Sequence, residues 1–154
     1  MKERSTEIAS LRSRLYALPK VDLHRHMEGS LRLQTLVDIA QEHGIDLPSY
    51  DIEYLRSFAT VANQAPDFHG FIKKFEFLRR FYLTPEAVER VAYEAVADAA
   101  ADNIKYLELR FNPAASAQRQ DFPLDQVVTW VCRATARAQH DHDICTRLIL
   151  QIDR

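Results

Sequence analysis

The sequence is poor in several features that mark whole classes of protein. Only three of its 154 residues are glycine, too few to build a glycine-rich phosphate loop. It has two cysteines, Cys132 and Cys145, which stand too far apart for a C-x-x-C site. One pair of thiols makes no disulfide framework, so we expect both cysteines to be reduced core residues.

Long apolar runs and basic clusters are also missing. No run of eighteen apolar residues is present, and charges are spread through the first twenty positions, so we expect no membrane span, no signal peptide and a cytoplasmic location. The formal net charge is −2, and no Lys/Arg cluster alternates with aromatic residues, which argues against nucleic acid as a partner. The expected ligand is therefore a small molecule.

What the sequence does contain is an alternation of helix and strand patterns. Residues 1–18 form a lead-in that we expect to be helical over 4–17, before Pro19. Strand patterns cover 21–28, 104–111 and 144–152, and helical patterns cover 31–45, parts of 51–82, a segment opened by Thr84-Pro85, and 124–139. Strands separated by helices indicate βαβ units and a parallel sheet, so the fold class is α/β.

Each strand pattern has one mostly apolar and one mostly polar face. By strict alternation the apolar face carries Val21, Leu23, Arg25, Met27, Leu107, Leu109 and Phe111, and the other carries Asp22, His24, His26, Glu28, Tyr106, Glu108 and Arg110. Strands of an open doubly wound sheet are usually apolar on both faces. A closed barrel, with polar groups inside its mouth, fits this pattern better, and the alternative is the edge of an open sheet.

The most informative stretch is VDLHRHMEGS, residues 21–30. Alternation sends His24 and His26 to one face, at the carboxyl-terminal half of a strand, and two imidazoles so placed can bind one metal ion. The sequence has a second H-x-H, formed by His140 and His142, but it precedes a strand rather than ending one. Since chemistry in parallel α/β proteins gathers at the carboxyl ends of strands, we expect His140 and His142 to be solvated loop residues.

At this point the sequence resembles a known family. The segment LPKVDLHRHMEGSLRLQTLVDIAQEHGIDLP (18–48) is similar to the opening of the adenosine deaminase family of metal-dependent hydrolases. The resemblance continues through FHGFIKKF (68–75) and ERVAYEAVADAAADNIKYLELRFNP (89–113). It implies a (β/α)₈ TIM barrel, one Zn²⁺ per complete active site, and hydrolytic removal of the 6-amino group from a purine nucleoside or base.

The resemblance also implies roles for individual residues. His24 and His26 match the first two zinc ligands of the family. Glu28 and Gly29 match substrate-binding positions, with the acid near the bound sugar. A helical flap that walls the purine pocket is matched by Phe68, Phe71 and Ile72.

Glu28 leaves the substrate open, because adenosine-specific members of the family usually have Asp there and relatives acting on adenine or modified 6-aminopurines often have Glu. Adenosine, adenine and a modified nucleoside therefore all stay as candidate substrates.

Several parts of such an enzyme have no counterpart in this sequence. The barrel needs eight strands and a catalytic zinc site needs three protein ligands, whereas residues 1–154 offer three strands and two matching histidines. We therefore expect a single incomplete domain, the amino-terminal part of a longer or split barrel, with the catalytic glutamate elsewhere. Alone it should be inactive and prone to aggregate. The alternatives are a non-catalytic regulatory chain and another H-x-H amidohydrolase.

Overall fold

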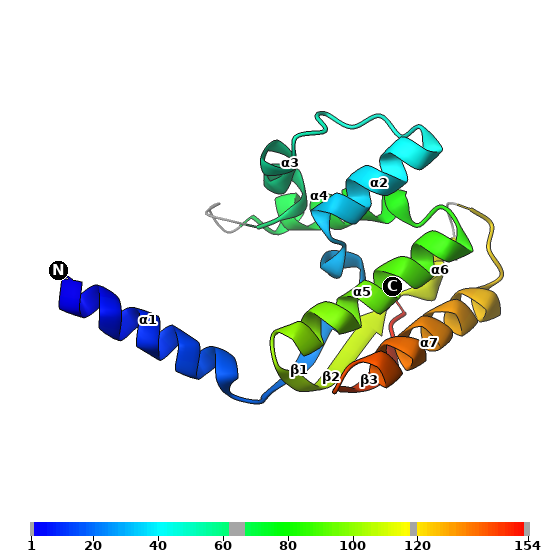
Figure 1. Cartoon of the computed structure of the whole chain (residues 1–154). Helices are drawn as coiled ribbons and strands as arrows, with labels where there is room; N and C mark the ends of the chain where they lie inside the picture. Colours follow the sequence, from blue (N-terminus) through cyan, green and yellow to red (C-terminus); the bar gives the residue numbers. More distant parts are fainter. Residues whose placement is uncertain (1, 62–66, 118–119, 153–154) are drawn as a thin grey trace.

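The computed structural model describes residues 2–61, 67–117 and 120–152, and Figure 1 shows how they are arranged. The elements, in chain order, are α1 (Lys2–Ala17), β1 (Lys20–His26), the 3₁₀ turn η1 (Glu28–Ser30), α2 (Leu33–His43), α3 (Ile52–Ala59), α4 (Phe68–Leu78), the 3₁₀ turn η2 (Arg79–Phe81), α5 (Pro85–Ala101), β2 (Ile104–Phe111), α6 (Pro113–Ala117), α7 (Leu124–Asp141) and β3 (Cys145–Leu150). Every element expected from the sequence is present. The short helix α6 was not predicted.

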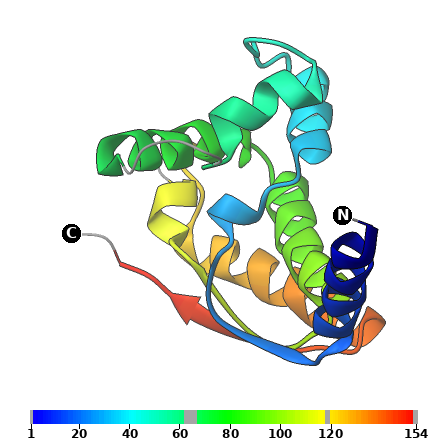
Figure 2. The ribbon, with the colours of Figure 1, turned by 90° about the vertical axis from the view of Figure 1, so that its left-hand side faces the viewer.

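The three strands form one parallel sheet in the order β1-β2-β3. Helices α5 and α7 lie together on one side of the sheet, as Figure 2 shows. The β2 side chains that point to this side, Leu107, Leu109 and Phe111, are fully buried in one core with apolar residues of α5 and α7. The α/β class and the parallel strands are thus confirmed.

Local sequence signals explain where two helices begin or end. The Thr84 hydroxyl accepts a hydrogen bond from the Ala87 amide at 3.2 Å, and Pro85 takes the first position of α5, where its missing N–H costs nothing. Helix α2 ends at Gly44, whose φ of 65° lies in the left-handed region that glycine adopts without strain.

The predicted alternation is confirmed in β2 but is wrong in β1. In the register of the sheet, Asp22 lies beside Leu107 and Arg25 beside Leu109, so both belong to the helix-covered side, where Asp22 forms an ion pair with Arg25 at 2.9 Å. Val21 and Leu23, predicted to pack against helices, are 63% and 57% exposed. The cause is an irregularity between Asp22 and Arg25, which shifts the register of the strand.

Helix α1 extends away from the rest of the molecule (Figure 1) and is held at its carboxyl-terminal end. The Tyr16 hydroxyl donates to the Ala101 carbonyl at 2.5 Å, and the Asn103 side-chain amide donates to the Ala17 carbonyl at 2.7 Å. These contacts attach α1 to the turn between α5 and β2.

Two other expectations concern the cysteines and the membrane. Both thiols are free, but Cys132 is exposed on α7, so its assignment to the core was wrong, and Cys145 is half-buried at the start of β3. Across the described residues, no helix combines the length and the apolar character that crossing a bilayer would need.

Candidate metal and substrate site

The carboxyl ends of the three strands are connected by backbone hydrogen bonds that continue past the strands. After β1, the Met27 amide donates to the Arg110 carbonyl at 2.9 Å, and after β3 the Gln151 amide donates to the Phe111 carbonyl at 2.9 Å. The residues that follow each strand are therefore fixed relative to one another. In parallel α/β proteins this edge of the sheet is where ligands bind.

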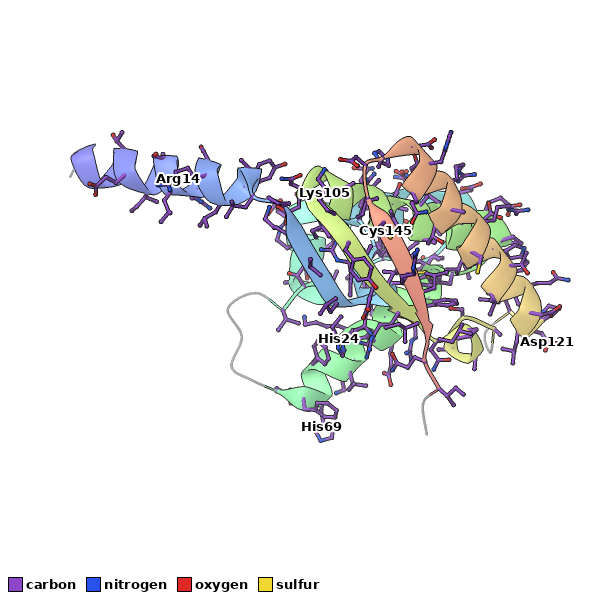
Figure 3. The ribbon with its side chains drawn as sticks, turned by 90° about the horizontal axis from the view of Figure 1, so that it is seen from below. Arg14, His24, His69, Lys105, Asp121 and Cys145 are labelled. Atoms are coloured by element: carbon purple, nitrogen blue, oxygen red, sulfur yellow. The ribbon has the colours of Figure 1, made fainter. Side chains whose placement is uncertain are left out.

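His24 lies at this edge, on the side of the sheet opposite α5 and α7 (Figure 3), and His26 lies beside Arg110 of β2 in the register. Their ring centroids are 5.3 Å apart, and the ring planes are tilted by 46°. A tetrahedral metal with metal–nitrogen distances of about 2.0–2.1 Å places two ligating imidazoles with centroids roughly 5 Å apart. The spacing and the donor type therefore fit a shared divalent cation. No group of three candidate ligands occurs within residues 2–61, 67–117 and 120–152.

Helix α4 covers one side of the histidine pair. The Phe75 ring meets His26 edge to face at 5.6 Å and contacts Phe71 at 5.0 Å. The side chain of Asp67 begins this helix by accepting hydrogen bonds from the amides of His69 and Gly70. A cavity of about 520 Å³ lies between α4 and the strand ends, lined by His26, Phe68, Phe71, Ile72, Phe75, Arg79, Gln151 and Ile152.

The three predicted flap residues thus share one cavity with a predicted metal ligand. Phe68 is 71% exposed, and Phe71 and Ile72 are about 40% exposed, so α4 presents an apolar surface to this cavity rather than filling it. Whether a purine lies against that surface stays a prediction.

Glu28 and Gly29 lie in the 3₁₀ turn η1, which follows β1. Glu28 is only 2% exposed, and its Oε1 accepts the Asn112 amide at 3.0 Å, so it joins the segment after β1 to the segment after β2. Gly29 borders a second opening of about 440 Å³ that also contacts His24 and His26. A Cβ built on Gly29 would lie 3.7 Å from the Phe75 ring, an ordinary contact, so packing alone does not require glycine there.

Two tyrosines near the strands carry raised pKa values. Burial raises the pKa of Tyr82 well above 10.0, and the nearby Glu28 charge raises it further. The Tyr82 hydroxyl therefore stays protonated and donates to the Met27 carbonyl at 3.3 Å, beneath η1. On the uncovered side of the sheet, the pKa of Tyr106 is raised by its hydrogen bond to Glu108, 3.1 Å long, and then by partial desolvation.

The second H-x-H lies away from this edge. His140 is exposed in the last turn of α7, rather than in a loop, and His142 follows the helix with its Nε2 3.4 Å from the Tyr93 hydroxyl. Both precede β3 and so lie toward the amino end of the sheet. The two pairs thus lie at opposite ends of the sheet, as their positions in the sequence predicted. The expectation of two solvated loop residues was wrong, because His140 belongs to a helix and His142 is half-buried against Tyr93.

Sequence reasoning missed some residues of the cavity. Phe75 was not among the predicted site residues, although its spacing of four residues from Phe71 placed it on the same face. Gln151 follows the carboxyl end of β3, a position that could have indicated it. Arg79 carries no such signal, because it enters the cavity only through the turn after α4.

The parallel β/α units place the chain among the α/β folds of amidohydrolases and deaminases. Comparison of folds agrees. A zinc-bound amidohydrolase from Burkholderia ambifaria superposes with a TM-score of 0.77 and 29% identity, over 92% of this chain and 38% of that protein. An adenine deaminase from Arthrobacter aurescens superposes with a TM-score of 0.75 and 28% identity, over 87% of this chain and 39% of that protein.

The sequence comparisons identify the family. The family model for adenosine deaminase matches residues 19–154, and the chain therefore belongs to the adenosine deaminase family. An adenosine deaminase from Vibrio vulnificus is 39% identical over 139 residues, which are 90% of this chain and 42% of that relative. The chain thus spans less than half the length of the curated relatives that it matches.

Proposed function

We propose that this chain supplies part of the zinc centre and part of the purine pocket of a hydrolase that removes the 6-amino group of an adenine-type substrate. The observation that carries the proposal is the pair His24 and His26, with centroids 5.3 Å apart at the carboxyl end of β1 and bordered by an apolar helix. Membership of the adenosine deaminase family supports the reaction, and the zinc bound by the Burkholderia relative supports the metal.

In this proposal His24 and His26 hold the metal through one ring nitrogen each. Bound zinc supplies the Lewis acidity that makes water a usable nucleophile near neutral pH. The imidazoles come from a hydrogen-bonded strand, which limits their motion and keeps both rings directed to one point. Phe71 and Ile72, with Phe68, give the flat apolar base a surface to lie on and keep water from it.

The substrate class follows from the relatives, and Glu28 leaves its members open. The matched relatives are named adenosine deaminase and adenine deaminase, so adenosine and adenine are the first substrates to consider, with a modified adenine nucleoside as the third. The product is the corresponding 6-oxopurine, with ammonia released. Gly29 borders the opening beside His24 and His26, and the buried Glu28 carboxylate supports this turn from behind, where the family resemblance puts the sugar side of the pocket.

The proposed centre needs further groups, because no set of three candidate metal ligands occurs within residues 2–61, 67–117 and 120–152. A catalytic zinc usually has three protein ligands, and protonation of the leaving amine needs a carboxylic acid. We infer that the remaining part of the same barrel provides them. The 154-residue chain alone should accordingly release no ammonia from adenosine or adenine above background.

A zinc titration with a built-in control tests the metal half of the proposal. The chain carries two H-x-H pairs, so His24→Ala/His26→Ala can be compared with the matched variant His140→Ala/His142→Ala. Calorimetry should show one zinc per chain in the wild type and in the matched control, and loss of binding in the first variant. Equal binding by both variants would contradict the assignment.

A chimera tests the reaction. Residues of this chain replace the matching 139 residues of the Vibrio vulnificus relative, and ammonia release is followed with adenosine and with adenine. The chimera should deaminate at least one of them, and its His26→Ala version should be inactive. A folded chimera that binds zinc but deaminates neither substrate would overturn the proposed reaction.

A further inference from the structure

Strand β1 contains one residue more than its partner β2 between two points of the register. Asp22 lies beside Leu107 and Arg25 beside Leu109, so three steps along β1 oppose two steps along β2. Such a bulge places two successive side chains on one face, instead of one on each. Alternation counted from Asp22 would send His24 and His26 to the helix-covered side, and the bulge returns both to the uncovered side.

The side chain of Asp22 forms two hydrogen bonds within this bulge. Its Oδ1 accepts the backbone amide of His24 at 3.2 Å, and its Oδ2 accepts the Arg25 Nε at 2.9 Å. Both side chains of the ion pair are about three-quarters buried, with 28% and 25% of their surfaces exposed. One carboxylate therefore fixes the backbone of the first histidine and the side chain of the residue between the two histidines.

We propose that Asp22 and Arg25 are positioning residues for the metal-binding pair: by holding the β1 bulge, they keep the imidazoles of His24 and His26 side by side and directed to one divalent cation. The inference rests on the proposed function, because it concerns the same pair of ligands. Neither residue needs to touch the metal. Asp22 acts through the His24 backbone, and Arg25 acts by orienting the Asp22 carboxylate.

Alternative roles for the ion pair make different predictions. A merely structural ion pair at this exposure would contribute to stability and leave metal affinity alone. A positioning role changes the affinity, since groups that orient ligands from behind typically alter metal binding by about 10–100-fold. The backbone contact also makes a prediction that needs no metal, because the His24 amide should exchange slowly with solvent while Asp22 accepts it.

The test measures Co²⁺ binding and His24 amide exchange in the same set of variants of the 154-residue chain. Asp22→Ala should lower Co²⁺ affinity by tenfold or more, change the visible spectrum of bound Co²⁺ and speed exchange of the His24 amide. Asp22→Asn keeps an oxygen that can accept this amide but loses the charge that holds Arg25, so its loss should be smaller. Arg25→Gln should lie between the two.

A matched control comes from α3, where Glu53 and Arg56 form another ion pair three residues apart, 3.0 Å long and exposed. Arg56→Gln should change neither readout. Thermal unfolding of every variant identifies any that fail to fold, and Asp22→Asn, with its similar shape, keeps the test valid in that event.

The outcomes separate the two proposals. Wild-type Co²⁺ binding that survives unchanged in Asp22→Ala and Arg25→Gln overturns the positioning role and leaves the proposed function standing. Unchanged His24 exchange in Asp22→Ala overturns it as well. If the wild type binds no Co²⁺ while its His24 amide is protected, the metal half of the proposed function fails, and the positioning role fails with it.

Discussion

Glu28 shows how a single residue can serve both the fold and the site. A carboxylate that is 2% exposed has lost nearly all contact with water, and burial of this kind is costly unless the oxygens are hydrogen-bonded. Its Oε1 accepts the Asn112 amide, in a segment 84 residues away along the chain. This contact joins the segments after β1 and β2 without involving any substrate.

Replacing Glu28 should therefore cost stability before any effect on substrate is considered. Glu28→Ala leaves the buried Asn112 amide without this acceptor and should lower the free energy of unfolding by about 1–3 kcal/mol. Glu28→Gln retains an oxygen in place and should cost less. Urea unfolding at pH 7 measures both, with Glu42→Ala on the exposed side of α2 as a control expected to change little. Equal losses for Ala and Gln would contradict the assigned contact.

At the scale of elements, helix α5 illustrates what the sequence determines locally. Thr84 and Pro85 set its start through a capping hydroxyl and a preformed φ, both of which depend on neighbouring residues only. Strand β2 was likewise predictable over 104–111, because its alternation is regular.

Strand β1 could not be predicted to the same depth. Its bulge depends on which residues of β2 lie beside Asp22 and Arg25, and alternation within one strand carries no such information. The assignment of His24 and His26 to one face was right, but Asp22 was placed with them wrongly. Helix α6, only five residues long, is too short for a periodic pattern to reveal.

The packing of α2 on α5 depends on a charged cluster around Glu94. This carboxylate accepts the Thr35 hydroxyl at 2.5 Å and the Arg90 Nε at 3.0 Å, and Arg32 lies 3.6 Å away. Arg90 also pairs with Asp38 of α2 at 2.6 Å. Two arginines on one largely buried carboxylate thus connect the helix after η1 to the helix that covers the sheet.

Loss of the Glu94 carboxylate should weaken the packing of α2 against α5 and so lower the stability of the fold. Glu94→Ala leaves the buried Thr35 hydroxyl without its acceptor and removes one of the two carboxylates that pair with Arg90, and it should lower the free energy of unfolding by roughly 1–3 kcal/mol. Glu53→Ala, in the exposed ion pair of α3, should cost under about 1 kcal/mol. Chemical denaturation compares the two. A Glu94 variant no less stable than the Glu53 variant would show that the cluster contributes little.

At the scale of the whole molecule, the candidate site was predictable as far as position along the strands determines it. The carboxyl ends of parallel strands meet at one edge, so the order of elements was enough to distinguish His24 and His26 from His140 and His142. Arg79 reaches the same cavity through the 3₁₀ turn η2 and Ile152 through the residues after β3, and no periodic pattern describes where such segments lead. The three-dimensional arrangement alone brings them together.

The sheet of three strands also has consequences for how the molecule behaves in solution. Strands β1 and β3 form its two edges in the part of the chain that the structure describes, and Val21 on β1 is 63% exposed. Open edges with apolar side chains pair with other chains, and a lysine on such an edge opposes this pairing.

We expect the wild-type chain to associate with increasing concentration and Val21→Lys to associate less. Gln126→Lys adds the same charge to an exposed position of α7 and should not alter association. Sedimentation velocity over a range of concentrations measures association of the wild type and both variants. A wild-type chain that stays monomeric throughout would show that these edges do not pair between molecules.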